Sequence, residues 1–161
     1  MIISGYQGIG KSTLAARNWT YIDLESSSFW YECPETKQMV RHSNWYDIYC
    51  NVAEHLSKQG YRVFVSSHQL VRDRLKKSSE NVCVCAPSLE LKDQWLDRLY
   101  TRFMESQLEK DYKAFANALD RYDENIKEIR DCGLPVIEIK KIPYDLDLLI
   151  NREVARRIEQ W

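Results

Sequence analysis

Apolar and polar positions along the chain follow two alternating patterns, short apolar runs and longer segments with helical spacing. The short runs predict strands at 1–4, 20–24, 62–66, 82–86 and 136–139. The segments between them predict helices at 11–18, 45–59, 69–77, 88–106, 108–131 and 145–160. Strands that alternate with helices are typical of a parallel sheet covered on both faces. We therefore predict a three-layer α/β fold with a five-stranded parallel sheet, formed by a single domain that spans residues 1–161.

The stretch between the last two predicted strands has the most regular pattern. Its apolar residues recur at alternating steps of four and three and form one stripe of a long helix: Leu108, Tyr112, Phe115, Leu119, Tyr122, Ile126 and Ile129. The preceding helix offers a matching stripe: Leu89, Leu96, Leu99 and Phe103. We predict an antiparallel helical hairpin over about residues 88–131, and a homodimer through the long helix is the alternative. The hairpin lies where a mononucleotide-binding core would carry a lid.

Residues 26–44 have the least periodicity of the chain, and we expect a mobile loop on the substrate side. Four aromatic residues in or beside this segment are candidates for stacking on a nucleobase: Trp30, Tyr31, Trp45 and Tyr46. Most other aromatic residues are expected in the core or at its rim.

The balance of charges argues against a general nucleic-acid-binding protein. The 161 residues include 23 Lys and Arg and 24 Asp and Glu, which gives a net charge of -1 and a pI near 6.3. Nucleic-acid binders usually carry an excess of basic residues. No apolar run approaches the length of a membrane span, and the chain opens on a predicted core strand without a charged leader. We therefore expect a cytoplasmic protein without membrane contact.

The five cysteines are an odd number without paired C-x-x-C spacing. Cys83 and Cys85 alternate within an apolar strand, which is typical of reduced core residues rather than of a disulfide framework or a zinc site. The three histidines are scattered and suggest no metal cluster.

The strongest chemical signal is the motif G-x-x-x-x-G-K-S, which occupies residues 5–12. A predicted strand precedes it and a predicted helix follows, which is the context that a phosphate-binding loop (P-loop) requires. Its successive backbone N–H groups form an anion cradle, Lys11 adds a positive charge for the β- and γ-phosphates, and the Ser12 hydroxyl can ligate Mg²⁺. The positive end of the helix dipole points at the same phosphates. The motif predicts a nucleotide-binding site.

Polar side chains follow the second and third predicted strands. Asp23 and Glu25 lie at the carboxyl end of one strand, the edge where ligands bind in open α/β sheets. Asp23 could hold Mg²⁺ or accept the proton of an attacking hydroxyl, and its alternative role is to cap the next turn. Ser67 and Arg72 follow the third strand, where Arg72 could reach an anionic acceptor. For Ser67, capping the next helix is the more frequent role.

Arg98 and Arg102 lie four residues apart and share one face of the first hairpin helix. Like charges at this spacing repel each other, whereas a site that neutralises a transferring phosphoryl group needs convergent guanidinium groups. The alternative is a solvated basic face on which Glu105 reaches back to Arg102. Lys92, nearby in sequence, is a weaker candidate.

With this loop and this order of elements, the chain resembles small P-loop kinases of the nucleoside monophosphate kinase group, including phage deoxynucleotide kinases and the shikimate and gluconate kinases. The resemblance covers the whole architecture, but only the phosphate loop is highly specific. In the family this loop binds ATP, which carries over to Gly8, Ile9, Gly10, Lys11, Ser12 and Thr13. Asp23-Leu24-Glu25 is similar to the family's D-x-D motif for substrate or metal. The family's adenine site lies near the loop that corresponds to residues 140–145.

The resemblance also implies roles for the acceptor segment and the lid. Residues 66–75 look like the segment that holds the acceptor in gluconate-type kinases, which assigns Ser67 and Arg72 to substrate binding. Lid arginines of the family contact the transferred phosphoryl group, a role that Arg98 and Arg102 match in order and setting. The expected activity is transfer of the γ-phosphoryl of ATP, with Mg²⁺, to a small acceptor, most often a nucleoside monophosphate.

The chain also departs from the wider P-loop pattern. Neither the third nor the fourth predicted strand ends in an acidic residue, which argues against ATPase motors and GTPase switches and leaves Ser12 and Asp23 for the metal. Two alternatives stay open. One is a kinase that acts on a polynucleotide end or another large acceptor, and the other is a non-catalytic protein in which ATP locks the hairpin for assembly with a partner.

Overall fold

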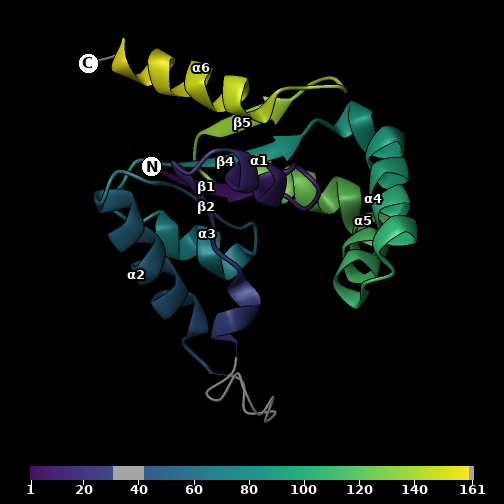
Figure 1. Ribbon diagram of the computed structural model, residues 1–161, viewed down its shortest axis with the longest axis horizontal. Coiled ribbons are helices and arrows are strands. Elements are labelled where there is room, and N and C mark those ends of the chain that lie inside the picture. The colour runs from purple at the N-terminus through teal and green to yellow at the C-terminus, as the bar shows by residue number, and fades with distance from the viewer. Residues whose placement is uncertain (31–41, 160–161) are drawn as a thin grey trace.

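A parallel sheet of five strands forms the centre of the protein in a computed structural model, which describes residues 1–30 and 42–159 (Figure 1). The strands are β1 (Ile2–Gly5), β2 (Tyr21–Asp23), β3 (Arg62–Ser66), β4 (Val82–Pro87) and β5 (Val136–Ile139). Their spatial order is β2-β3-β1-β4-β5, and every neighbouring pair is parallel. The predicted α/β class with a five-stranded parallel sheet is confirmed.

Helices connect the strands at the predicted places, with ends that differ by at most two residues, except that α4 begins four residues later than predicted. The α-helices are α1 (Lys11–Arg17), α2 (Trp45–Lys58), α3 (Gln69–Leu75), α4 (Lys92–Ser106), α5 (Glu109–Arg130) and α6 (Leu146–Ile158). Two short 3-10 helices are η1 (Ser26–Phe29) and η2 (Leu89–Leu91). The predicted helix at 88–106 therefore begins as η2 and continues as α4. The predicted loop 26–44 begins with η1, and its residues 31–41 lie outside the described part of the chain.

Helices cover both faces of the sheet. Adjacent residues of a strand point to opposite faces, so each strand contributes side chains to two separate hydrophobic clusters. Ile2 of β1 packs in a cluster with residues of α2 and α3, such as Tyr49 and Val71. The next residue, Ile3, packs in a second cluster that includes residues of α5 and α6, such as Ile126 and Ile150. Near-continuous apolar strands such as β4 are the consequence of this two-sided burial.

The carboxyl ends of three strands meet at one edge of the sheet. Gly5 of β1 pairs with Ser66 of β3, and Asp23 of β2 pairs with Phe64 of β3. The chain leaves β1 at this edge, forms the glycine-rich loop and enters α1. The register therefore brings the motif of residues 5–12 beside Asp23 and Ser66, as the parallel topology predicts.

α4 and α5 form the predicted antiparallel hairpin, which projects from the sheet (Figure 1). Lys92, near the start of α4, pairs with Asp123 in the second half of α5 at 2.6 Å. At the other end, the rings of Phe103 and Tyr112 lie 5.4 Å apart. Lys92 thus joins the two helices through an ion pair, and it does not line the cavity described below.

The predicted apolar stripe of α5 is correct only in its second half. Tyr122, Ile126 and Ile129 are buried, whereas Leu108, Tyr112 and Leu119 are exposed. Arg121 has non-helical backbone angles, with φ -130° and ψ 23°, so the helix kinks there. Before the kink the buried positions move by one residue, to Asp111 and Ala118. Apolar residues spaced alternately four and three apart share one face only in an unbroken helix, and α5 is kinked at Arg121. The dimer through this helix stays a prediction.

Four of the five cysteines are buried and free, as predicted for core residues: Cys50, Cys83, Cys85 and Cys132. Burial raises the pKa of the Cys50 thiol and of the Cys83 thiol to about 12, so both stay protonated at neutral pH. Cys33 lies outside the described residues. Across residues 1–30 and 42–159, no helix combines the length and the apolar character needed to cross a bilayer.

Candidate functional site

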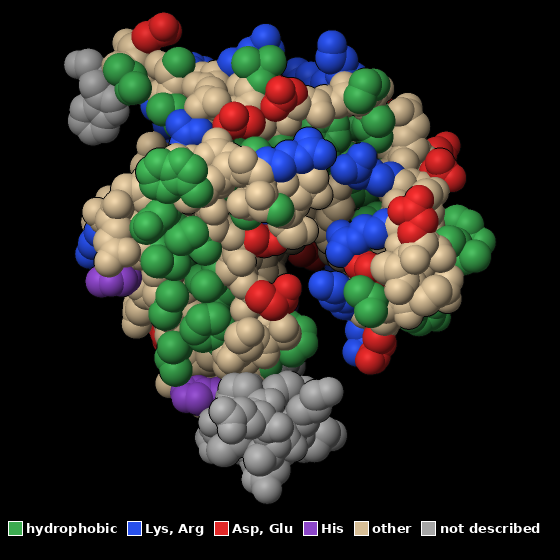
Figure 2. Space-filling view, in the orientation of Figure 1, with side chains coloured by type: hydrophobic (Ala, Val, Ile, Leu, Met, Phe, Trp, Pro, Cys, Tyr) green, Lys and Arg blue, Asp and Glu red, His purple; other side chains and the backbone are tan. Residues whose placement is uncertain are grey.

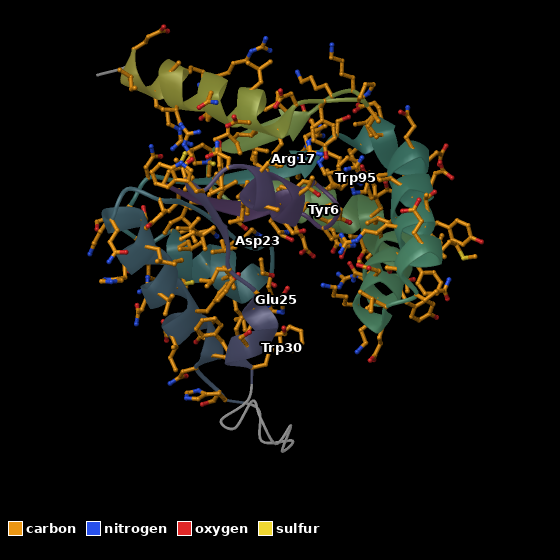
Figure 3. All side chains as sticks on the ribbon, viewed as in Figure 1. Tyr6, Arg17, Asp23, Glu25, Trp30 and Trp95 are labelled. Atoms are coloured by element: carbon orange, nitrogen blue, oxygen red, sulfur yellow. The ribbon has the colours of Figure 1, made fainter. Side chains whose placement is uncertain are left out.

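A cavity of about 690 Å³ lies at the carboxyl edge of the sheet, between the sheet and the hairpin. Figure 2 shows it as a hollow with acidic side chains on one side and basic side chains on the other. In Figure 3, Asp23 and Glu25 lie on the sheet side of this gap and Trp95 lies on the hairpin side. Residues of the glycine-rich loop, of the ends of β2 and β3 and of the hairpin line it.

The carbonyl groups of the glycine-rich loop are held by side chains from other elements. The Trp95 indole donates to the Gln7 carbonyl, and Arg98 Nε donates to the Gly8 carbonyl, both at 3.0 Å. The Tyr144 hydroxyl donates to the carbonyl of the next residue, Ile9, also at 3.0 Å. Three successive carbonyls are thereby fixed by α4 and by the loop before α6, which sets the orientation of the peptide planes between them.

The N–H groups of the same loop make no such contacts. Within the described part of the chain, the backbone N–H groups of six residues donate to no protein acceptor: Gln7, Gly8, Gly10, Lys11, Ser12 and Thr13. Groups at a helix start lack intrahelical partners and require a ligand or water. An anion of several oxygens matches such a row of donors, because each oxygen accepts more than one hydrogen bond.

Two glycines of the motif are required by backbone shape. Gly8 and Gly10 have φ of 83° and 92°, the left-handed region that favours glycine. A Cβ at Gly8 would also lie 2.8 Å from Leu99 Cδ2 and 3.3 Å from Trp95 Nε1. Gly8 therefore allows the close approach between the loop and helix α4.

Lys11 lies at the start of α1, and its amine points back along the loop. Its Nζ donates to the Gly5 carbonyl at 2.9 Å and to the Tyr6 carbonyl at 3.4 Å. Burial is the main cause that lowers the pKa of this amine, and the carboxylates of Asp23 and Glu25 oppose the effect. The adjacent Ser12 and Thr13 side chains are exposed and line the cavity, so their hydroxyls are accessible to a ligand.

Asp23 and Glu25 line the cavity opposite the hairpin, as predicted. Burial raises the pKa of the Asp23 carboxyl, while Lys11 lowers it and the neighbouring Glu25 raises it further. Ser66 and Ser67 continue the same wall from the end of β3. Tyr49 of α2 connects the two strand ends, because its hydroxyl donates to the Leu24 carbonyl at 2.7 Å and accepts from the Ser66 N–H at 2.9 Å.

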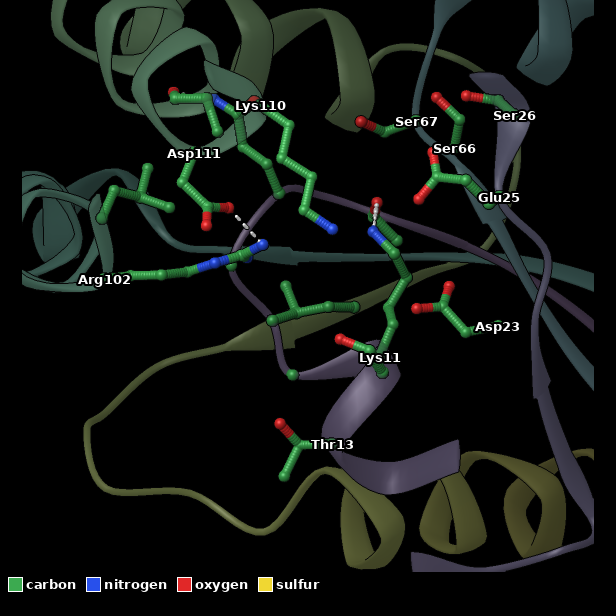
Figure 4. Close-up of a pocket in the computed structure, with 18 of the residues that line it drawn as sticks. Lys11, Thr13, Asp23, Glu25, Ser26, Ser66, Ser67, Arg102, Lys110 and Asp111 are labelled. Atoms are coloured by element: carbon green, nitrogen blue, oxygen red, sulfur yellow. Dashed lines mark hydrogen bonds and ion pairs between the residues drawn. The ribbon is translucent and has the colours of Figure 1, made fainter. Parts of the chain in front are cut away.

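Arg102 faces the cavity from α4 and is held by a buried carboxylate (Figure 4). Its guanidinium forms an ion pair with Asp111, with 2.5 Å between Nη2 and Oδ1, and the Ser106 hydroxyl donates to Asp111 Oδ2 at 2.6 Å. Lys110, beside Asp111 on α5, extends its amine into the cavity toward Lys11. The positive charges of Lys110 and Arg102 both act to lower the pKa of the Asp23 carboxyl. The site thus brings three basic groups, Lys11, Arg102 and Lys110, to one part of the cavity.

Arg98 also lines the cavity, but its guanidinium is already engaged. Besides its bond to the Gly8 carbonyl, it lies 5.7 Å from the ring centres of both Trp95 and Tyr144. Those two rings stack with 6.1 Å between their centres. Arg98 therefore joins α4, the glycine-rich loop and the loop before α6, and its described contacts are with the protein frame of the site.

Arg72 differs from its prediction, because it does not line the cavity. It is 5% exposed, donates to the Ser67 carbonyl and lies 3.7 Å from Glu128 of α5. Ser67 lines the cavity as predicted, but the helix cap is the next residue, His68, whose Nδ1 accepts from the Leu70 N–H at 3.3 Å. Arg72 thus binds the backbone of Ser67 from the side that faces away from the cavity.

The aromatic residues predicted to stack on a nucleobase lie mostly in the packing of α2. Trp45 is buried, and its ring lies 6.3 Å from Trp30 and 6.2 Å from Tyr46. None of these three lines the cavity, and Tyr31 lies outside the described residues. The aromatic residue that does line it is Tyr49, one helical turn after Trp45.

Three residues of the site carry no motif in the sequence: Tyr49, Lys110 and Asp111. The buried aspartate is the only one with a local signal, since Ser106 and Asp111 flank the turn between two predicted helices. Tyr49 and Lys110 each belong to an ordinary amphipathic helix, and only the tertiary arrangement selects them.

No group of three or more His, Cys, Asp or Glu side chains that could hold a metal ion occurs in residues 1–30 and 42–159. Ser12 and Asp23 are among the side chains that offer oxygen ligands in the cavity, and a serine with one carboxylate suits a cation bound together with phosphate oxygens rather than in an all-protein cage. A second hollow of about 460 Å³ is lined by residues of the loop 140–145 and of α6.

A scan against models of protein families finds no match for this chain, and a search of curated proteins finds no relative.

Proposed function

We propose that this chain is a P-loop kinase, which transfers the γ-phosphoryl of ATP with Mg²⁺ to a small acceptor. One observation carries the proposal: six backbone N–H groups that donate to no acceptor within residues 1–30 and 42–159 surround the start of α1, where Lys11 and Ser12 lie. Such a donor row with an adjacent amine and hydroxyl suits the phosphates of a nucleotide. The parallel sheet, with this loop at its carboxyl edge, supports the same reading.

The donor set fits ATP and Mg²⁺. Ser12 would hold the metal directly and Asp23 would hold it through a bound water, which leaves the carboxylate free for the acceptor; the metal would neutralise phosphate charge. The N–H groups of the loop bind the β- and γ-phosphate oxygens, and the Lys11 amine exchanges the Gly5 and Tyr6 carbonyls for those oxygens. This exchange favours bound nucleotide, because two neutral acceptors are replaced by charged ones.

The remaining residues act on the transferred group and the acceptor. Arg102 and Lys110 line the cavity from the hairpin, and in this proposal they would neutralise the charge of the transferring phosphoryl group. Asp23, opposite them, orients the acceptor and accepts its proton. Positioning and charge neutralisation supply most of the catalysis in such a site, and closure of the hairpin over the cavity excludes water.

Membership in the nucleoside monophosphate kinase group is part of the proposal. The loop, the parallel sheet and the α4–α5 hairpin support it, as do Arg102 and Asp23 on opposite sides of the cavity. The residues themselves support only a small acceptor, and a nucleoside monophosphate is the prediction of the resemblance. A cytoplasmic location likewise stays a prediction.

The test combines nucleotide binding with turnover. Calorimetry of wild type with Mg²⁺ and a non-hydrolysable ATP analogue should show one site, and Lys11→Met should weaken it at least tenfold. Wild type with ATP, Mg²⁺ and a panel of small hydroxyl and phosphate acceptors should release ADP in an acceptor-dependent manner. Tight binding without turnover of any acceptor would contradict the kinase and favour the non-catalytic alternative.

A further inference from the structure

We infer that the acceptor is an uncharged hydroxyl compound, such as a nucleoside or a sugar, rather than a nucleoside monophosphate. The inference rests on the proposed phosphotransfer and concerns the wall of the cavity opposite the hairpin. We name this the acceptor wall, and it consists of Asp23, Leu24, Glu25, Ser26, Tyr49, Ser66 and Ser67.

The two sides of the cavity differ in their basic residues, although carboxylates line both: Glu105 and Asp111 on the hairpin side, and Asp23 and Glu25 on the acceptor wall. The acceptor wall holds the carboxylates of Asp23 and Glu25, three serines and no basic residue among the described residues. The basic residues that line the cavity all come from the loop and the hairpin: Lys11, Arg98, Arg102 and Lys110. Figure 4 shows Asp23, Glu25 and the serines on one side and Arg102 and Lys110 on the other.

Arg72, which lies behind the acceptor wall, is not available to a ligand. Arg72 lies beneath Ser67, donates to its carbonyl and faces Glu128, and its side chain is 6% exposed. A phosphate of the acceptor bound at this wall would meet the carboxylates of Asp23 and Glu25. The ammonium group that acts on both carboxylates, that of Lys11, is engaged by the ATP phosphates in the proposed function. Specific recognition of a phosphate dianion normally uses such a group, because a hydrogen bond to a charged donor is about twice as strong as a neutral one.

The wall does suit an acceptor with several hydroxyl groups. Carboxylates accept hydrogen bonds from hydroxyls, and serine hydroxyls both donate and accept. Asp23, the last residue of β2, and Glu25, two residues later, can engage neighbouring hydroxyls of a single ring. The opposite charges of the two sides then serve different ligands, the basic side for ATP phosphates and the acidic side for the uncharged acceptor.

In the proposed step, the acceptor hydroxyl oxygen forms a bond to the γ-phosphorus of ATP. The bond between this phosphorus and the bridging β–γ oxygen breaks, and its electron pair stays on ADP. The proton of the acceptor hydroxyl passes to the Asp23 carboxylate, so the products are ADP, a phosphate monoester and a protonated Asp23.

Matched acceptor pairs that differ only by one phosphate test the inference. Wild type is incubated with ATP and Mg²⁺ and either the four deoxynucleosides or ribose, and in parallel with their 5′-monophosphates, while ADP release is measured. We expect kcat/KM for the best uncharged acceptor to exceed that of its monophosphate at least tenfold.

A variant that adds a cation to the wall provides a second readout. Glu25 is exposed, so Glu25→Lys is expected to fold, and it should change the ratio of the two kcat/KM values at least tenfold toward the monophosphate. Asp120→Lys makes the same charge change on the exposed surface of α5, outside the cavity, and should leave the ratio unaltered.

The outcomes separate the two levels of the proposal. Preference for monophosphates by wild type, or an unchanged ratio in Glu25→Lys, overturns the uncharged acceptor and leaves phosphotransfer standing. If no acceptor of either kind releases ADP although the ATP analogue binds, the phosphotransfer itself is overturned, and the inference fails with it.

Discussion

The guanidinium of Arg102 on α4 contacts the carboxylate of Asp111 on α5, with 2.5 Å between Nη2 and Oδ1. The Arg102 side chain is 44% exposed, whereas that of Asp111 is 3% exposed. The buried partner therefore fixes the orientation of the accessible one, and Ser106 holds the same carboxylate from the turn between the helices. This pair presents a positive charge to the cavity near the turn that connects the two helices of the hairpin.

We predict that Asp111→Asn and Arg102→Gln are coupled in stability. Because Arg102 is partly solvated, the coupling should be about 1 kcal/mol, below the ~3–5 kcal/mol for breaking a fully buried pair. Denaturant unfolding of wild type, both single variants and the double variant gives this value. A coupling of zero would show that the contact is not formed in solution.

The same pair gives a kinetic prediction. If Asp111 acts through Arg102, Asp111→Asn lowers kcat about tenfold, which corresponds to ~1.4 kcal/mol in the activation barrier, and changes KM less.

Gly8 is predicted to be the more sensitive of two glycines with similar backbone angles. Gly8→Ala meets both an unfavourable φ of 83° and the side chain of Leu99, whereas Gly60→Ala has φ of 93° and no neighbour within 4 Å. The backbone strain alone should cost about 1–2 kcal/mol. We expect Gly8→Ala to cost about 1–3 kcal/mol more, because it also overfills the contact with α4. If Gly8→Ala and Gly60→Ala lower the free energy of unfolding equally, in thermal or denaturant unfolding, the loop does not approach α4 closely.

Asp23 is predicted to lower the stability of the unliganded protein at neutral pH. Burial raises its pKa above the ordinary 3.8, so between 3.8 and the raised value the folded state binds more protons than the unfolded state. Stability falls as pH rises through that window, because the ionised carboxylate is disfavoured in the fold. Asp23→Asn should therefore have a higher Tm than wild type at pH 7, and the difference should disappear below pH 3.8.

Two controls accompany this measurement. Asp120→Asn removes an exposed carboxylate of α5 outside the cavity and should reproduce no such pH-dependent gain. Under the proposed function, Asp23→Asn also loses most turnover, which is the exchange of stability for activity expected at a functional site. A variant less stable than wild type at pH 7 would show that Asp23 is a structural residue.

The glycine-rich loop and the sheet could be predicted because their signals are local. The motif of residues 5–12 fixes glycines at positions of positive φ and a lysine at the start of a helix, and neighbouring residues alone determine those needs. The alternation of strands and helices fixed the class for the same reason. The carboxyl edge of a parallel sheet then placed Asp23 and Glu25 beside the loop without knowledge of any contact.

The hairpin side of the site could not be predicted in the same way. The non-helical angles at Arg121 change which residues of α5 are buried, and no residue type there marks a kink. Gln107 takes a left-handed φ of 53°, and this turn brings Asp111 under Arg102 and directs Lys110 into the cavity. Arg72 lies in the predicted segment, but it is buried and forms an ion pair with Glu128, which is distant in sequence.

The most direct test follows the labelled γ-phosphoryl of ATP in wild type and in Lys11→Met. Lys11→Met removes the amine but keeps the apolar length of the side chain, and burial already disfavours the charge, so the variant should fold with undiminished stability. With Mg²⁺ and the acceptor panel, we predict label in a phosphorylated acceptor for wild type and at least a hundredfold less for Lys11→Met. Label that stays in ATP, that appears only as inorganic phosphate, or that is transferred equally by Lys11→Met would contradict the proposed kinase.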